Sequence, residues 1–256
     1  MRIYVLTQED ATSIPPLLDH LLASRRDVVG VGIVPGELRV GRAGRYWRMM
    51  GARDFTLQAL NVLGHRALDG IARAVPMPRS YSVAGAARRA GVPCEAVPKV
   101  NAPELLDRLR SAAVDLIVSI ACPQKFGREL LALPRLGCIN LHGALLPRYQ
   151  GLLPSFWVLA KGETETGVTV HWMDERIDHG DLLLQERVPI EAGDTVHSLV
   201  RRSKIGVGRH LLVRAIELIE RGEAPRVPMD FSRASYFSYP DAAAVAELRA
   251  RGRRFI

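Results

Sequence analysis

The stretch GCINLHGALLPRYQG, residues 137–151, combines a short apolar strand with two polar side chains at its end. Cys138 and Ile139 begin the strand, and Asn140 and His142 follow two residues apart. Because successive side chains of a strand point to opposite faces, Asn140 and His142 lie on the same side. This pattern fits either a polar pair satisfied at a strand end or one half of an active site.

Strand-like and helix-like segments alternate on both sides of this stretch. Upstream, VDLIVSIAC (114–122) is typical of a buried strand and FGRELLALP (126–134) of a short helix. Downstream, PSFWVLAKGE (154–163) predicts a helix and GVTVHWM (167–173) a strand. The alternation indicates the α/β class: a Rossmann-like, doubly wound, mostly parallel sheet with helices on both faces.

Two further segments, one near the N-terminus and one before residue 222, allow more specific predictions. MRIYVLT (1–7) predicts the first strand, and Ser13 ahead of a proline predicts a hydroxyl N-cap for the helix that follows. Residues 192–222 are helical in period, and we expect one break there, at Gly206 or Gly208.

The character of the sequence changes after Arg221. We therefore assign residues 1–222 to the main, catalytic domain and residues 223–256 to a C-terminal appendage docked on it, since so short a segment cannot fold independently. Its apolar pair Tyr236 and Phe237 suits either the core or the contact of a homodimer.

The composition of the sequence indicates the general class of protein and its expected location. At 256 residues, with 48% hydrophobic and 24% charged residues, the chain can bury a full core. The first residues turn polar too early for a signal peptide and there is no eighteen-residue apolar run, so no membrane partner is expected. Three cysteines without a CxxC pair favour a reduced, cytoplasmic location.

The net charge of +8 invites a nucleic-acid interpretation. Only four of the 35 basic residues are lysines, however, and such a skew often reflects coding bias towards arginine. The basic residues are scattered, apart from the C-terminal tail and a cluster at Arg201, Arg202 and Lys204. Attraction to a phosphorylated or carboxylated small molecule explains the charge equally well.

A second polar cluster, HWMDERIDHGD (171–181), follows the strand GVTV. We expect neighbouring strands to bring Asp178 within reach of His142, while His171 is equally consistent with a structural core histidine. An amide, an imidazole and a carboxylate together suit acyl transfer to an amine, with donors for an oxyanion and a carboxylate for the proton. No spacing typical of metal ligands occurs, so no metal is predicted.

These two segments resemble the core of the folate-dependent formyltransferases, a family that includes glycinamide ribonucleotide, methionyl-tRNA and amino-sugar formyltransferases. The shared pattern is an N-x-H strand end, an S-L-L-P-x-Y/F-x-G loop and a V-H-x-x-x-x-x-x-D-x-G segment. The match is close over residues 114–195. The chain departs from the pattern at Ala144, where the family has the loop serine.

The resemblance implies that Asn140 and His142 stabilise an oxyanion, while Asp178 holds His142 and relays the proton that leaves the amine. It implies 10-formyltetrahydrofolate as the formyl donor, used as a co-substrate without a metal. Two loops would bind its pterin, largely through the backbone: Gln124, Lys125 and Phe126 after one strand, and Met173, Asp174, Glu175 and Arg176 before the essential aspartate.

The acceptor is expected to be a small-molecule primary amine, with an amino-sugar nucleotide or a secondary-metabolite amine favoured. The loop LTQEDATSIPP (6–16) has no glycine, and Glu9 and Asp10 would repel a phosphate there. By resemblance, the tRNA enzymes carry a C-terminal barrel, for which we expect no room after Gly222. The alternatives are a methionyl-tRNA formyltransferase-like enzyme without that barrel and a catalytically idle binding protein.

Overall fold

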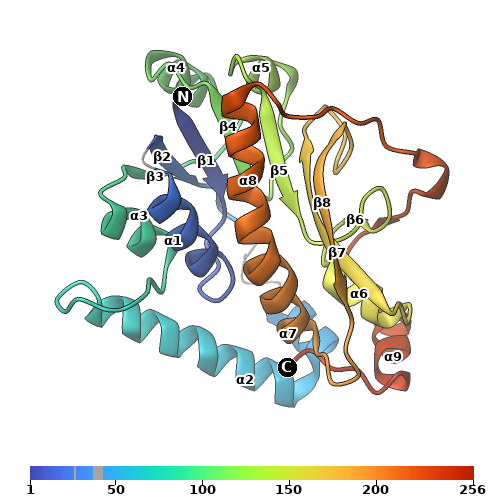
Figure 1. Cartoon of the computed structure of the whole chain (residues 1–256). Coiled ribbons are helices and arrows are strands. Elements are labelled where there is room, and N and C mark those ends of the chain that lie inside the picture. Colours follow the sequence, from blue (N-terminus) through green and yellow to red (C-terminus); the bar gives the residue numbers. More distant parts are fainter. Residues whose placement is uncertain (26, 37–42) are drawn as a thin grey trace.

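A seven-stranded sheet forms the centre of the molecule (Figure 1) in a computed structural model that describes residues 1–25, 27–36 and 43–256. Its order is β3-β2-β1-β4-β5-β7-β8. The first five strands of that order pair in parallel, and β7 and β8 complete the sheet with antiparallel pairings. The strands are β1 (Ile3–Thr7), β2 (Val28–Ile33), β3 (Cys94–Ala96), β4 (Leu116–Ile120), β5 (Cys138–His142), β7 (Glu165–Trp172) and β8 (Leu182–Pro189).

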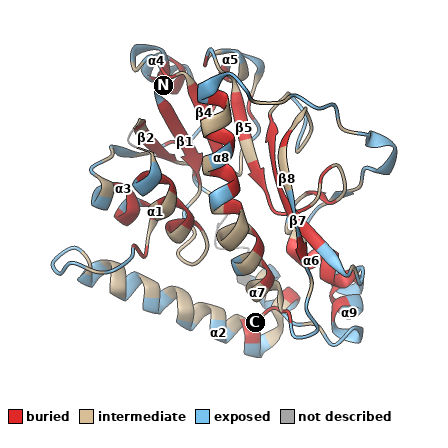
Figure 2. Cartoon of the chain, in the orientation of Figure 1, coloured by how far each residue is buried: buried red, intermediate tan, exposed pale blue. Residues whose placement is uncertain are grey.

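Helices cover both faces of this sheet, which confirms the predicted Rossmann-like class. On one face α1 (Ile14–Ser24), α3 (Val83–Ala90) and α8 (Gly208–Arg221) pack in one apolar cluster with the strands. On the other face α4 (Pro103–Ser111) and α5 (Arg128–Ala132) form a second cluster. The central strands β1 and β4 are buried along their whole length (Figure 2), as expected for strands covered on both sides.

Strand register brings the polar residues of β5 beside those of its neighbours. Asn140 lies opposite Ser119 of β4 on one side and His171 of β7 on the other. His142 lies opposite Thr169 of β7. The carboxyl end of β5 therefore carries polar side chains that lie next to polar side chains of β4 and β7.

Two local expectations are wrong. Ser13 has helical backbone angles (φ −108°, ψ −38°), and its side chain makes no cap hydrogen bond. Asp10 Oδ1 instead accepts hydrogen bonds from the backbone N–H groups of Thr12 and Ser13, at 2.8 and 2.9 Å. A side-chain cap needs an extended backbone at the capping residue, which Ser13 does not have.

The second concerns residues 192–222, where we expected a break at Gly206 or Gly208. The chain continues instead from α7 (Val196–Val200) through a π-helix, η2 (Arg201–Val207), into α8. A π-helix adds one residue to the turn and shifts the side chains that follow it, so η2 resets which residues face the sheet.

The long helix α2 (Ala43–Ile71) runs along the edge of the molecule, beneath α1 in Figure 1. Gly51 interrupts it with a φ of +79°, a left-handed value that favours glycine and bends the helix. Beyond this bend, Leu60 and Leu63 are exposed. None of the helices in the described residues is long and apolar enough to cross a membrane.

A third apolar cluster joins the C-terminal residues to the rest. It combines Phe156 and Trp157 of α6 (Pro154–Ala160) with Leu248 of α9 (Ala242–Ala250). Two short strands, β6 (Gln150–Gly151) and β9 (Tyr236–Phe237), pair in parallel beside it. The Phe237 ring stacks on Trp157 at 4.5 Å, so Phe237 packs within the chain.

Replacing Leu248 with alanine tests how firmly the C-terminal helix is anchored. Leu248 is fully buried, so Leu248→Ala should lower the free energy of unfolding by about 2–5 kcal/mol through lost burial and a residual cavity. Leu60→Ala, the same change at a side chain that is 61% exposed, is the matched control. Urea unfolding measures both, and equal losses would contradict this packing.

Candidate active site

Three of the predicted side chains meet at the carboxyl end of β5. Asn140 and His142 come from the strand, and Asp178 comes from the loop between β7 and β8. Asp178 Oδ1 accepts a hydrogen bond from Asn140 Nδ2 at 3.1 Å and lies 3.3 Å from His142 Nδ1. The structure thus brings together the amide, the imidazole and the carboxylate on which the sequence interpretation depends.

The His142 ring is fixed at both nitrogens. Its Nε2 lies 2.8 Å from the backbone oxygen of Tyr149, and its Nδ1 faces Asp178. Since the carbonyl can only accept, the Nε2–H donates to Tyr149. Nδ1 is therefore the nitrogen that faces the other polar side chains, and a ring protonated at both positions donates in both directions.

Asp178 is held in an unusual conformation by the segment that follows β5. Its φ is +47°, a left-handed value that costs energy for a non-glycine residue. Gly151 N–H donates to Asp178 Oδ2 at 2.8 Å, and the Gln150 side-chain amide donates to the Asp178 backbone oxygen, also at 2.8 Å. These bonds fix the carboxylate independently of its contacts with Asn140 and His142.

The charge balance of the site keeps Asp178 ionised. Burial alone would raise the pKa of this carboxyl, because its side chain is only 9% exposed. The attraction and hydrogen bonding of His142, followed by those of His171, outweigh burial and hold the pKa of Asp178 well below its usual range. The carboxylate is therefore an acceptor at neutral pH.

His171, whose role the sequence left open, belongs to the same polar group. It is 1% exposed, and its Nε2 lies 3.2 Å from Asn140 Nδ2 and 3.7 Å from Asp178 Oδ1. Its Nδ1 lies 2.8 Å from the backbone oxygen of Trp172. With that Nδ1–H donating, Nε2 accepts from Asn140, so both amide hydrogens of Asn140 are used.

Ala144, the departure from the family pattern, is fully buried. Thr169 Oγ1 on the adjacent strand donates to the Ala144 backbone oxygen at 2.6 Å. Thr169 Oγ1 itself accepts from the Leu146 backbone N–H at 3.2 Å and from the Gln185 side-chain amide at 2.9 Å. Thr169 therefore holds this loop through its main chain.

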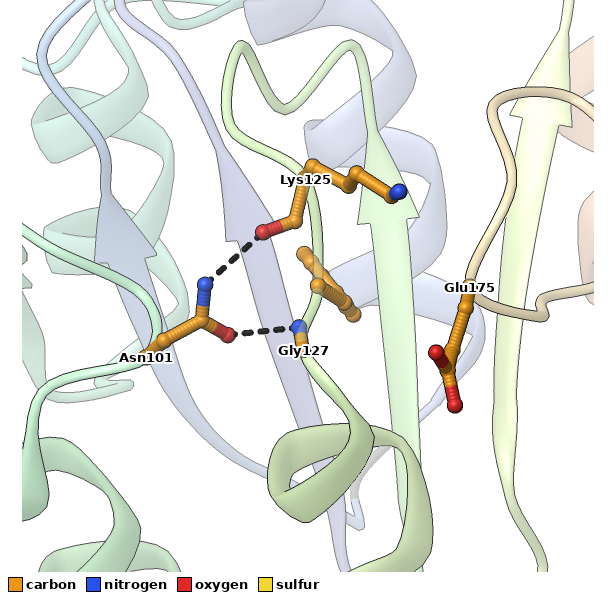
Figure 3. A pocket seen from close by; sticks show the side chains of 5 residues that line it. Asn101, Lys125, Gly127 and Glu175 are labelled. Carbon is orange, nitrogen blue, oxygen red and sulfur yellow. Dashed lines mark hydrogen bonds between the residues drawn. The ribbon is translucent and has the colours of Figure 1, made fainter.

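The two loops predicted to bind the pterin border a pocket of about 230 Å³ (Figure 3). Its lining comprises Asn101, Lys125, Phe126, Gly127 and Glu175. Asn101 holds the first loop, donating to the Lys125 backbone oxygen at 2.9 Å and accepting from Gly127 N–H at 2.7 Å. Glu175 projects from the opposite side, where it pairs with Arg128 at 2.9 Å.

The other predicted pterin residues are engaged within the protein. The Gln124 side chain bonds to Val100 N–H and the Pro98 backbone oxygen, and the Phe126 side chain is buried in the second apolar cluster. Met173 packs partly against that cluster, and Asp174 pairs with His179 at 2.5 Å. Arg176 is exposed. Of the predicted pterin residues, Lys125, Phe126 and Glu175 line the pocket.

Lys204 is a neighbour of the site that sequence reasoning placed only in a basic cluster. It lies on η2, half-buried, and its Cδ would be 3.9 Å from a Cβ built on Gly143. Burial lowers its pKa, and attraction to Asp178 and Asp10 opposes that shift. Its ammonium has no hydrogen-bond or ion-pair partner among the described residues. Arg202, by contrast, pairs with Asp194 and Glu191.

Across the described ranges, no group of three or more His, Cys, Asp or Glu side chains is placed to hold a metal ion. The Asp174–His179 pair therefore forms part of the loop hydrogen bonding.

Comparison with known proteins shows the family to which the chain belongs. Residues 71–216 match the family described as formyl transferase. The methionyl-tRNA formyltransferase of Moorella thermoacetica is 39% identical over 198 residues, which cover 73% of this chain and 63% of that protein. The chain thus spans less than two thirds of this relative.

Solved structures share the fold at lower identity. Glycinamide ribonucleotide transformylase 1 from Symbiobacterium toebii superposes with a TM-score of 0.62 at 23% identity, over 89% of this chain and 94% of that one. An N-formyltransferase from Helicobacter canadensis, solved with folinic acid and dTDP-3-aminofucose, gives 0.59 at 16% identity, over 97% and 79%. The chain belongs to the formyl transferase family, as the motif resemblance indicated.

The depressed pKa of Asp178 predicts a pH-dependent contribution to stability. Because the folded-state pKa lies below the unfolded value of about 3.9, the contribution is complete above about pH 5 and is lost as the pH falls below it. Asp178→Asn should cost about 1–3 kcal/mol at pH 7. Urea unfolding from pH 7 to 3 should show this difference shrinking in acid, and a constant difference would contradict the assignment.

Lys204 predicts the opposite effect. Because burial lowers the pKa of Lys204, its charged form is less favourable in the folded state than in the unfolded chain, which lowers the free energy of unfolding. Lys204→Met should raise the free energy of unfolding at pH 7 by more than the roughly 0.5 kcal/mol typical of surface changes. Lys161→Met, at a lysine paired with Glu247, is the control and should not stabilise. Thermal unfolding compares the two, and a destabilised Lys204→Met would contradict this prediction.

Proposed function

We propose that the protein is an N-formyltransferase that moves the formyl group of 10-formyltetrahydrofolate to a primary amine. The observation that carries the proposal is the meeting of Asn140, His142 and Asp178 around one carboxylate oxygen. Membership of the formyl transferase family supports the formyl donor, and the pocket bordered by Lys125 and Glu175 offers a place for its pterin. The folate is a co-substrate that supplies the formyl carbon.

The proposed reaction needs hydrogen-bond donors for the formyl oxygen and a group that accepts the proton of the amine. As the amine nitrogen bonds to the formyl carbon, the formyl oxygen gains negative charge, which needs hydrogen-bond donors in place beforehand. His142 offers its Nδ1–H when the ring is protonated at both nitrogens, because the Nε2–H is committed to Tyr149. Asn140 offers its amide by exchanging the contact with His171 Nε2 for the substrate oxygen. Both donors approach from the same side of β5.

The proton balance assigns the remaining role to Asp178. An attacking primary amine becomes positively charged and must lose a proton before the formamide forms, while the departing folate nitrogen must gain one. Asp178 is ionised and lies beside His142 Nδ1, so it can take a proton directly or through that ring. Its fixation by Gly151 N–H keeps Oδ1 directed at the donors.

For the acceptor, we propose a small-molecule primary amine, with an amino-sugar nucleotide as the first class to test. Structural similarity to an enzyme solved with dTDP-3-aminofucose supports this choice at the level of the fold. Lys204, whose ammonium is unpaired among the described residues, provides a positive charge close to the end of β5 for an anionic acceptor.

Methionyl-tRNA is the second candidate acceptor. The relative at 39% identity is a methionyl-tRNA formyltransferase, and α2 exposes Arg45, Arg48, Arg53 and Arg66. Arginine on an exposed helix suits phosphate contacts, which would make binding steeply dependent on salt. A folate-release assay with methionyl-tRNA and with amino-sugar nucleotides separates the two candidates.

The proposal predicts tetrahydrofolate release from 10-formyltetrahydrofolate that depends on the amine. Asn140→Ala and Asp178→Asn should each lower the rate by about 100- to 1,000-fold, since each removes a group from the reacting centre. Absorbance of the released folate gives the rate, and mass spectrometry of the acceptor confirms the added formyl group.

Asp181→Asn is the matched control for Asp178→Asn. It makes the same chemical change three residues away, at a side chain with no hydrogen-bond partner in the described part of the chain. Its rate should match that of the unmodified protein. Absence of folate binding and of turnover with every amine would contradict the proposed function, and near-full activity of Asp178→Asn would contradict the assigned roles.

A further inference from the structure

The segment between α8 and α9 reaches the loops that hold the active site, although it lies outside the residues that match the family. We call residues 231–238 the strap; it contains η3 (Phe231–Arg233) and β9. In Figure 1 the chain leaves α8, passes along the side of the molecule on which β6 lies, and ends in α9. The strap itself contains none of the predicted catalytic residues.

The strap binds the loop after β5 mainly through Ser235 and Phe237. Ser235 Oγ accepts from Tyr149 N–H at 2.9 Å, and the Ser235 backbone oxygen accepts from Gln150 N–H at 2.8 Å. The Phe237 backbone oxygen accepts from Leu152 N–H at 2.8 Å. The Phe237 ring also stacks on Tyr149 at 5.4 Å.

These contacts act on His142 through Tyr149. The Tyr149 carbonyl accepts the Nε2–H of His142, and Tyr149 has a φ of +59°. A left-handed conformation at a non-glycine residue persists only where its surroundings enforce it. Ser235 bonds the amide of this residue and Phe237 packs on its ring, so the strap fixes the carbonyl that orients the imidazole.

A parallel route leads to Asp178. Gln150 and Gly151, which bond Asp178, are the two residues that pair with β9. A Cβ on Gly151 would lie 2.2 Å from the Phe237 backbone oxygen, so the close approach of the strap requires glycine there. At the other end of the strap, Phe231 stacks on His179, the residue after Asp178, at 4.0 Å.

We propose that the strap positions the catalytic side chains, with Ser235 as the positioning residue that selects Nδ1 of His142 as its reacting nitrogen. Without the Ser235 hydroxyl, Tyr149 loses the partner of its amide. Its carbonyl is then held only by the Gln150 N–H of the same peptide unit, which bonds the Ser235 backbone oxygen, and by the contact of its ring with Phe237. The imidazole is then held less tightly in its orientation towards Asp178. The kinetic part of this inference rests on the proposed formyl transfer, whereas the geometric part does not.

The test compares Ser235→Ala with the unmodified protein in two measurements. The first is ¹H–¹⁵N NMR of the imidazole in the protein without substrate, assigned with His142→Gln; the Nε2–H of His142 should exchange with water about 3- to 10-fold faster in Ser235→Ala. The second is formyl transfer, in which kcat should fall about 3- to 10-fold while KM for both substrates stays within about twofold.

Two further variants separate positioning from general stability. Ser235→Thr keeps a hydroxyl and should restore both measurements, which a purely structural defect would not predict. Ser232→Ala makes the same change within the strap at a residue that contacts Asp230 instead of the loop after β5, and should match the unmodified protein. Circular dichroism verifies that each variant folds.

The outcomes distinguish this inference from the proposed function. Active protein with an unchanged Nε2–H and unchanged kcat in Ser235→Ala would overturn the role of the strap. Faster exchange in Ser235→Ala, together with no transfer to any amine by the unmodified protein, would overturn the proposed function and support the positioning of His142.

Discussion

The carboxylate of Asp178 is the point on which the rest of the site depends. One oxygen faces His142 and Asn140, and the other accepts the backbone N–H of Gly151. Such a buried charge is costly unless its partners are in place, and here β5 supplies two of them and the following loop the third. Strand β5 and the loops around it are thereby held in a single geometry.

That geometry is built from main-chain groups as much as from side chains. The Tyr149 carbonyl orients His142, the Gly151 N–H orients Asp178, and the backbone of the Ala144 loop is tied to Thr169. A serine in place of Ala144 is therefore not needed to keep the loop in place. The left-handed conformations of Tyr149 and Asp178 place backbone strain beside the proposed catalytic side chains, where neighbouring elements hold it.

The sequence predicted the parts that follow from periodicity. Alternation of strands and helices indicated the fold, and the two-residue spacing of Asn140 and His142 placed both on one side of β5. The approach of Asp178 to His142 was expected from the pairing of neighbouring strands, and the motif resemblance implied its role as the third catalytic group. The orientation of His142 could not be predicted, because its ring is held by a hydrogen bond to the backbone carbonyl of Tyr149. Every residue type has such a carbonyl, so the sequence does not indicate the bond.

The cap of α1, the direction of the basic side chains on η2 and the position of the strap could not be predicted, because each depends on the conformation of neighbouring residues. Asp10 replaces Ser13 in capping the first helix because the backbone at Ser13 is already helical. The π-helix at residues 201–207 directs Lys204 towards the site and Arg202 towards Asp194, a division that the basic cluster in the sequence does not suggest. The strap reaches the site by long-range pairing between β9 and β6.

The most direct measurement is a crystal structure of the protein with 5-formyltetrahydrofolate bound. The account predicts the pterin in the pocket between Lys125 and Glu175, with the formyl oxygen about 2.7–3.1 Å from the amide of Asn140 and the Nδ1 side of His142. A folate bound elsewhere, or a formyl group directed away from both side chains, would contradict it.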